Sequence, residues 1–420
     1  MGIIRKLKYF YNPIFLSVFI CLLIFYLPKK QLDLGDNLKS LLNQNQITKI
    51  YCYMENSPVK VSSGKSYLCK ARLIEIEDNK GLKSSAQGRI SLLIPCNLVE
   101  AYYPGKLYSI ANGNNHLYEA GSYYSFEGKL SNGFFQVQKC LNSYWPKNIY
   151  GRVDYFRSLC RLQFKRMMYA WGKAGALFLS LLSGSREYLE TKVGELFRNS
   201  GLSHILALSG MHLSIFTSLA VFVGKKLKSK KATYILQLTT LFLFVWFAGF
   251  SPSLLRAFIF SSLLFISLLA GYKNPDLLIV LSFTFLLQVI ISPQDIYSIA
   301  FKLSYGALAG ILLLSDFINS FISKFIPQKI SSSISASCAA QIFTGPICIK
   351  NFGCIYPIGI ISSIFISPLI SLFIILGLLL LIITLLIPCF LPCSEFIMNI
   401  LYNLIILITG TFSKAPRINF

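Results

Sequence analysis

Residues 201–216 read GLSHILALSGMHLSIF and carry two of the chain's three histidines. The run is largely apolar, and Ser209-Gly210 interrupts what would otherwise be a plain hydrophobic helix. A glycine inside a helical pattern usually marks close packing or a bend. Polar groups at membrane depth are costly unless they face protein or water. The stretch therefore predicts a specific polar feature inside a membrane.

The rest of the composition supports a membrane protein. The 420 residues are 54% hydrophobic and 14% charged, and several apolar runs approach the ~20 residues that cross a ~30 Å hydrocarbon core. We predict an α-helical polytopic membrane protein with about 8–10 membrane segments. Beyond the N-terminal helix, these segments are expected at 202–223, 233–250, 254–271, 276–291, 299–314, 333–349, 356–388 and 396–410. The run 356–388 contains Ser367-Pro368, so a kinked helix and two half-helices both remain open, as does the side of the C-terminus.

Charged flanks predict the orientation. Arg5, Lys6 and Lys8 precede an apolar run at 9–27, which is too long for a signal-peptide core and lacks a small-residue cleavage site. Residues 1–30 are therefore predicted to form an uncleaved helix with a cytoplasmic N-terminus. The lysines of the segment 225–231 form the strongest cytoplasmic marker. Counting back from them places residues 31–148 outside a cytoplasmic (inner) membrane.

Residues 31–148 are polar and rich in turns. Short alternating stretches predict strands at 47–54, 67–76, 88–94, 106–111, 123–130 and 134–140. Five or six short strands in ~110 residues fit a small extracytoplasmic β-barrel. Its cysteines Cys52, Cys69, Cys96 and Cys140 would be free to pair in an arrangement that the sequence does not fix.

Residues 149–200 begin with a basic, amphipathic stretch. Its cations include Arg152, Arg157, Arg161, Lys165 and Arg166. A helix of this kind lies on an anionic membrane surface. The alternative is a rim of positive charge at a channel mouth, and both interpretations stay open.

The histidines and Ser209 do not form a recognisable catalytic or metal motif. On a continuous helix His204 and His212 would be ~80° and ~12 Å apart, so they would not share a metal without a break at Ser209. Ser209 lacks the G-x-S-x-G context of a hydrolase nucleophile. The chain has no P-loop and no G-x-G-x-x-G after a strand. We predict no catalytic residue, no metal, no cofactor and no enzyme activity.

Polar residues also interrupt three other apolar segments. Arg256 lies one turn into a helix that follows Ser251-Pro252, and either snorkelling to the interface or facing an aqueous path would explain it. Together these places predict a polar cavity within residues 201–420. The residues predicted to line it are His204, Ser209, Gly210, His212, Ser251, Pro252, Arg256, Lys302, Ser304 and Gln341.

The stretch GLSHILALSGMHLSIF resembles the signature of the ComEC family of competence proteins, inner-membrane channels for transforming DNA. LLSGSREYLETKVGELFRNS, SPSLLRAFIF and FKLSYGALAG are similar to other motifs of that family, in the same order. The β region resembles its OB-like domain through Tyr103-Pro104-Gly105-Lys106. Many members also carry a C-terminal metallo-β-lactamase-like domain, which this chain lacks. Where the family tends to have Asn before a late helix, this chain has Ser362-Ser363.

The resemblance implies that single-stranded DNA passes inward through the helices. It also implies a separate nuclease, a cytoplasmic DNA-translocating ATPase and membrane lipid as partners, and allows a homo-oligomer. The expected DNA contacts are Arg152, Arg157, Arg161, Lys165, Arg166 and Lys106. Tyrosines such as Tyr102, Tyr103, Tyr123 and Tyr124 would stack bases or would simply be strand residues.

Two other functions remain open. The net charge of +23 fits a polyanion partner, but positive-inside topology explains much of it. A carrier for a small anionic or lipid-linked solute fits the broken helices and polar cavity equally well. A third possibility is an assembly scaffold.

Overall fold

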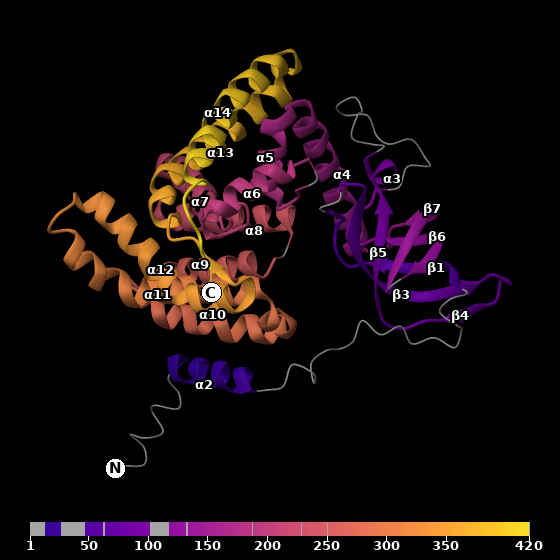
Figure 1. The fold of residues 1–420 in the computed structure, drawn as a ribbon, viewed down its shortest axis with the longest axis horizontal. Helices are drawn as coiled ribbons and strands as arrows, with labels where there is room; N and C mark the ends of the chain where they lie inside the picture. The colour runs from indigo at the N-terminus through magenta and orange to yellow at the C-terminus, as the bar shows by residue number, and fades with distance from the viewer. Residues whose placement is uncertain are drawn as a thin grey trace, which may run out of the picture. The chain divides into compact units, whose positions relative to one another are not determined.

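The structure is a computed structural model, which describes residues 13–26, 47–61, 64–100, 117–131, 133–186, 188–227, 229–249 and 251–419. Contacts within the chain divide it into two compact units. The helical unit comprises residues 1–32, 180–184 and 190–420, and the barrel unit comprises residues 33–179 and 185–189. The predicted interfacial segment 149–200 is thus divided between them. Figure 1 labels the elements of each unit.

The barrel unit is built on a closed ring of five strands. The order around the ring is β1–β3–β5–β7–β6 and back to β1, with only β5–β7 parallel. This is an OB-like barrel, as the sequence predicted. The ring strands are β1 (Ile47–Met54), β3 (Ser66–Asp78), β5 (Arg89–Pro95), β6 (Tyr123–Ser131) and β7 (Phe134–Tyr144).

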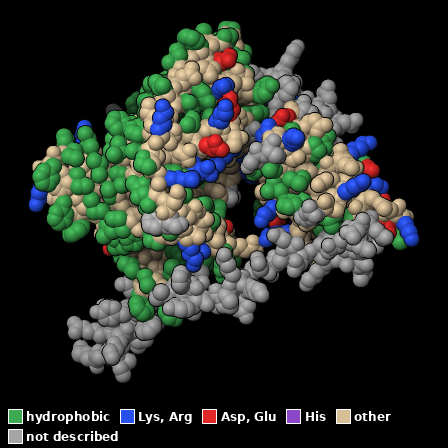
Figure 2. Space-filling model, viewed as in Figure 1, with side chains coloured by type: hydrophobic (Ala, Val, Ile, Leu, Met, Phe, Trp, Pro, Cys, Tyr) green, Lys and Arg blue, Asp and Glu red, His purple; other side chains and the backbone are tan. Residues whose placement is uncertain are grey.

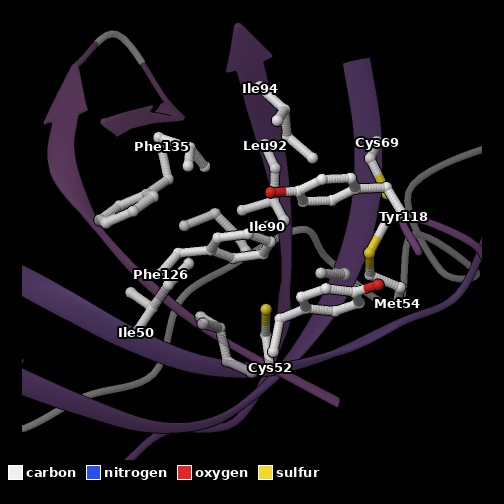
Figure 3. Close-up of a cluster of buried hydrophobic side chains, with 14 of the residues drawn as sticks. Ile50, Cys52, Met54, Cys69, Ile90, Leu92, Ile94, Tyr118, Phe126 and Phe135 are labelled. Carbon is white, nitrogen blue, oxygen red and sulfur yellow. The ribbon is translucent and has the colours of Figure 1, made fainter. Parts of the chain in front are cut away.

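Five of the six predicted strands are therefore confirmed, and the sixth, at 106–111, lies outside the described residues. Two short strands were not predicted, β2 (Val59–Lys60) and β4 (Lys83–Ser85), since so few residues carry no alternation. Alternate residues fill the barrel, as on β5, where Ile90, Leu92 and Ile94 are buried. Figure 3 shows them pointing into a cluster with Phe126 and Phe135.

A short helix, α3 (Cys96–Glu100), follows β5 in the chain. The longer helix α4 (Ile149–Ala170) follows β7 and packs on this barrel. Leu162 of α4 joins the buried cluster of the barrel, and Leu159 packs against it. Part of the apolar face that was expected to contact lipid therefore contacts the barrel. Asn148 caps the helix by accepting a hydrogen bond from the Gly151 amide at 2.8 Å.

The cations of α4 require a correction. Arg161 and Lys165 are buried, and they pair with Glu119 through Nε–Oε2 and Nζ–Oε1 distances of 3.2 and 2.8 Å. Arg166 is buried as well. Arg161 and Lys165 are therefore not available as DNA contacts in this structure, because Glu119 holds their charges in the protein interior. Arg152 remains exposed, and Lys106 lies outside the described residues.

Glu119 is the common partner in this network, and Ser57 also donates a hydrogen bond to it. Burial by itself would raise the pKa of Glu119, but the charges of Arg161 and Lys165 outweigh burial and hold the pKa well below its ordinary range. The network therefore ties α4 to the barrel through an ionised carboxylate.

The helical unit contains the membrane segments. Among the described residues, 6 helical stretches are long and apolar enough to cross a membrane, and the protein is a multi-pass membrane protein. They are α8 (Lys230–Ala248), α9 (Pro252–Leu269), α11 (Ile299–Ile322), α12 (Gln328–Phe352), α13 (Gly359–Leu386) and α14 (Leu391–Phe412), the last extended by η5 (Pro388–Phe390). Shorter helices of this unit are α2 (Pro13–Tyr26), α6 (Thr191–Asn199), α7 (Gly210–Gly224) and α10 (Leu277–Ile291). Helix α5 (Gly172–Ser183) begins in the barrel unit and ends in the helical unit.

One feature of these helices settles a point that the sequence left open. α13 is one continuous helix of 28 residues with Pro368 inside it, so the run 356–388 does not split into two half-helices. α11 and α12 form a close pair, in which a Cβ added at Gly310 would lie 2.5 Å from the Ala339 carbonyl oxygen. Apolar side chains cover much of the helical unit on the face that Figure 2 shows, as lipid contact requires.

Candidate functional site

The site begins where α7 begins, at Gly210, because residues 202–209 are not helical. The predicted interruption at Ser209-Gly210 is thus a helix N-terminus. Ser209 and His212 form a capping box, in which the Ser209 amide donates to His212 Nδ1 at 3.2 Å. Since Nδ1 accepts this bond, the proton of the neutral imidazole lies on Nε2. Gly210 and Met211, which lie between Ser209 and His212, begin the first turn of α7.

His212 is fully buried. In this structure its ring caps α7 from inside the unit. Its Nε2 is enclosed and has no hydrogen-bond partner among the described residues. His204, in contrast, is exposed in the non-helical segment before α7. The two histidines therefore lie on different elements and have different surroundings.

Arg256 of α9 lies beside the start of α7. Ser251 caps α9 by accepting a bond from the Leu254 amide at 3.3 Å, and Pro252 occupies the first turn. A Cβ added at Gly210 would lie 3.6 Å from Arg256 Nη2. That separation is an ordinary van der Waals contact, so the guanidinium lies directly beside the first turn of α7.

The guanidinium has no matching negative charge in the described part of the chain. No ion pair found there includes Arg256, and its Nε is buried without a hydrogen-bond partner. The side chain reaches toward the first turn of α7. Arg256 is partly buried, and a partly buried guanidinium without a carboxylate is costly unless another anion is present.

A hydrogen-bonded network fixes the elements around Arg256. Tyr305 of α11 donates to Gln288 Oε1 at 2.9 Å. Gln288 of α10 donates in turn to the Pro252 carbonyl at 2.9 Å and to Asp295 Oδ2 at 3.2 Å. Asp295 belongs to the turn η4 (Pro293–Tyr297). The network joins α9, α10, η4 and α11, and Tyr305 also interacts electrostatically with Arg256.

Sequence reasoning missed Gln288, Asp295 and Tyr305. A signal was available for Gln288, because it is the single amide in the apolar run of α10 and is fully buried. Tyr305 lies in the FKLSYGALAG stretch, but Lys302 and Ser304 were named there instead. Lys302 is exposed, and no described hydrogen bond connects either residue to the network.

Gln341 belongs to a second polar cluster, where α12 and α13 meet the segment before α7. A Cβ added at Gly359 would lie 3.0 Å from Gln341 Nε2, and one added at Gly201 would lie 2.7 Å from the Gly359 Cα. Ser362 donates to the Ser200 carbonyl at 2.7 Å. Ser362, one of the two serines at the place of the expected asparagine, therefore joins the end of α6 to α13.

The structure thus brings together Ser209, Gly210, His212, Ser251, Pro252 and Arg256 from the predicted set, and it leaves His204, Lys302, Ser304 and Gln341 elsewhere. No three His, Cys, Asp or Glu side chains of the described ranges are grouped as metal ligands would be. The arrangement suits binding of an anion by one guanidinium.

Comparison with known proteins assigns the family. A sequence model described as "Competence protein" matches residues 181–419. The chain belongs to the competence protein family. The resemblance inferred from GLSHILALSGMHLSIF is thereby confirmed, and the matched residues include α7, α9, α10 and α11, which carry the network.

A second comparison finds similarity to a curated competence protein. This chain is 30% identical over 138 residues to "ComE operon protein 3" of Bacillus subtilis (strain 168), a match that covers 32% of this chain and 18% of that protein. The shared stretch is therefore a small part of the relative's length. No solved structure matches the chain.

Proposed function

We propose that this competence protein passes single-stranded DNA across the cytoplasmic membrane during natural transformation, as a channel or translocase component. The observation that supports this most is the position of Arg256. Its guanidinium lies beside the N-terminus of α7, among apolar helices, without a carboxylate partner in the described residues. A passing phosphate would supply the missing negative charge, and both the guanidinium and the helix N-terminus favour an anion.

The surrounding elements suit this role. The backbone of Gly210 places the first turn of α7 next to the Arg256 guanidinium. Tyr305 and Gln288 hold α9, α10 and α11 in register, which would keep the guanidinium in place as successive phosphates pass. We propose that the OB-like barrel lies outside the cell and that the α7–α8 connection, with Lys225 and Lys226, lies inside. A separate nuclease, a cytoplasmic ATPase and a homo-oligomer belong to the same proposal, in which this chain is not an enzyme.

The test is entry of labelled DNA into cells, measured as nuclease-protected single strands. Arg256→Gln removes the charge but keeps a polar side chain of similar length. We expect it to reduce protected strands at least tenfold, with surface-bound label unchanged, because one charged hydrogen-bonded contact is worth roughly 1.5–3 kcal/mol. Arg256→Lys should retain part of the uptake.

Lys329→Gln is the matched control, because Lys329 is an exposed cation on α12. Cells that carry Lys329→Gln should take up DNA normally. Immunoblots of the membrane fraction separate transport from folding. Normal entry by Arg256→Gln, at normal membrane levels, would contradict the proposal.

A carrier for a small anionic or lipid-linked solute is the second candidate. It is favoured by one observation, that a single guanidinium rather than a row of cations lies at the site. The DNA channel and the small-anion carrier should differ in whether a long polyanion competes for the site and in how binding depends on salt. A long polyanion should displace a bound short oligonucleotide with a steep salt dependence if DNA is the substrate, whereas a small-anion carrier should show a shallow one.

A further inference from the structure

The outer surface of the barrel carries a row of five side chains, one from each ring strand. Direct cross-strand pairing joins Arg89 of β5 to Arg72 of β3, Arg72 to Tyr53 of β1, Tyr53 to Tyr123 of β6, and Tyr123 to Tyr144 of β7. The neighbours Cys52, Met54 and Tyr124 are buried. Since side chains alternate along a strand, the row points outward.

The three tyrosines of the row form a continuous set of rings. Tyr53 and Tyr123 have centroids 5.1 Å apart with tilted planes. Tyr123 and Tyr144 are stacked, with centroids 4.9 Å apart and planes within 4°. Tyr144 ends the row and is 59% exposed. β7 pairs with β5 only through residues 134–136, so no described strand covers the outer face of the Tyr144 ring.

The other end of the row is basic. Arg72 Nη2 lies 3.0 Å from Glu55 Oε1, and Arg89 Nε lies 2.8 Å from Glu55 Oε2. One carboxylate, that of Glu55, therefore holds two guanidiniums beside the tyrosines. Asp154 of α4 interacts electrostatically with Tyr53, but Arg157 lies close to Asp154 and offsets it.

A second row on the same surface shows what a purely structural arrangement looks like. Lys139 of β7, Glu127 of β6, Lys49 of β1 and Glu77 of β3 are direct cross-strand neighbours with alternating charge. Lys49 Nζ lies 2.8 Å from Glu77 Oε1. These charges cancel along the row. The tyrosine row instead combines stacked rings with two guanidiniums that share one carboxylate.

We propose that the tyrosine row, Tyr53–Tyr123–Tyr144 with Arg72 and Arg89, is a capture site for single-stranded nucleic acid. A base would stack on the open face of Tyr144, and the backbone would follow the row toward the two guanidiniums. Base stacking on aromatic rings beside basic groups is how proteins bind single strands without reading sequence. Duplex DNA fits the site poorly, because its bases are already stacked on each other. This inference rests on the proposed DNA transport and adds where the strand is first held.

The test is binding of a fluorescein-labelled oligo-dT of about 16 nucleotides to the full chain in phosphatidylcholine nanodiscs. An abasic oligomer of equal length, which has phosphates but no bases, is the second probe. Tyr144→Ala should weaken oligo-dT binding about tenfold, the effect of removing one base stack. It should leave binding of the abasic oligomer unchanged. Tyr144→Phe should bind both like the parent, since the ring is retained.

Tyr150→Ala is the matched control, because Tyr150 on α4 is an exposed tyrosine outside the row. It should bind both probes normally. Parental affinity of Tyr144→Ala for oligo-dT would overturn the proposal. An equal loss for both probes, with a lowered unfolding temperature, would also overturn it, because the rings would then only stabilise the sheet.

The outcome is separable from that of the DNA-entry assay. If Tyr144→Ala binds oligo-dT normally but Arg256→Gln still blocks entry, the capture site is wrong and the membrane route stands. If Tyr144→Ala loses oligo-dT selectively while Arg256→Gln cells take up DNA normally, the membrane route is wrong and the capture site stands.

Discussion

Arg256 and Glu119 both place a charged group in the interior, and their surroundings differ. Glu119 interacts with Arg161, Lys165 and Ser57, so its charge is fully compensated. Arg256 has an enclosed Nε without a partner among the described residues. The first arrangement is expected of a structural network and the second of a site that receives an anion.

The Glu119 network gives a prediction for stability. Glu119→Gln leaves two buried cations without their carboxylate, and we expect the free energy of unfolding to fall by about 3–5 kcal/mol at neutral pH. Thermal unfolding of the purified protein in detergent measures this. Glu75→Gln is the control, because its pair with Lys83 is exposed, with 3.6 Å between charged atoms. It should cost no more than about 1 kcal/mol, and an equal effect of both changes would contradict a structural role for Glu119.

The same carboxylate should make stability depend on pH. Because folding lowers the pKa of Glu119, its stabilising contribution is complete above the ordinary value near 4.5 and is lost as the pH falls below it. The unfolding temperature of the parent should therefore fall below about pH 4.5, and that of Glu119→Gln should fall less. Parallel curves for the two proteins would show that Glu119 titrates normally.

At the scale of elements, the sequence predicted the helices and strands that a periodic pattern of neighbouring residues indicates. β3 and β5 were predictable because alternate residues are apolar, and α9 because Ser251-Pro252 opens an apolar run. The Arg256 site was only partly predictable, because Gln288, Asp295 and Tyr305 meet it through packing of distant elements. The burial of Arg161 and Lys165 was not predictable, because their partner Glu119 lies more than 40 residues earlier, outside any local pattern.

The join between α6, α7 and α13 gives a prediction at this scale. Gly201 has φ +74° and its backbone contacts Gly359 so closely that an added Cβ would lie 2.7 Å from the Gly359 Cα. Gly201→Ala must therefore strain the backbone and separate two elements. We expect the variant to be nearly absent from the membrane fraction by immunoblot.

Gly194→Ala is the matched control for that change. Gly194 lies inside α6, and nothing lies within 4 Å of an added Cβ. Alanine there should be neutral or stabilise the helix by about 0.5–1 kcal/mol. Normal levels of Gly201→Ala would show that the close approach of residues 201 and 359 does not fix the fold.

At the scale of the whole molecule, the direction of transport depends on topology. The proposal requires the barrel outside, where DNA arrives, and the connection after α7 inside. Ser131→Cys, at the exposed end of β6, and Lys226→Cys, in η3 (Lys225–Leu227), report on these two places. In spheroplasts, a membrane-impermeant maleimide should label Ser131→Cys above the parent level. Lys226→Cys should be labelled only after permeabilisation.

The parent chain is an essential comparison, because it has 11 cysteines of its own. Those in the barrel core, Cys52 and Cys69, are buried and should react slowly. The reverse labelling pattern would place the tyrosine row in the cytoplasm, where incoming DNA would meet it only after crossing. The row would then receive strands after transport instead of capturing them before it. DNA would meet Arg256 first and the barrel second, the reverse of the proposed order.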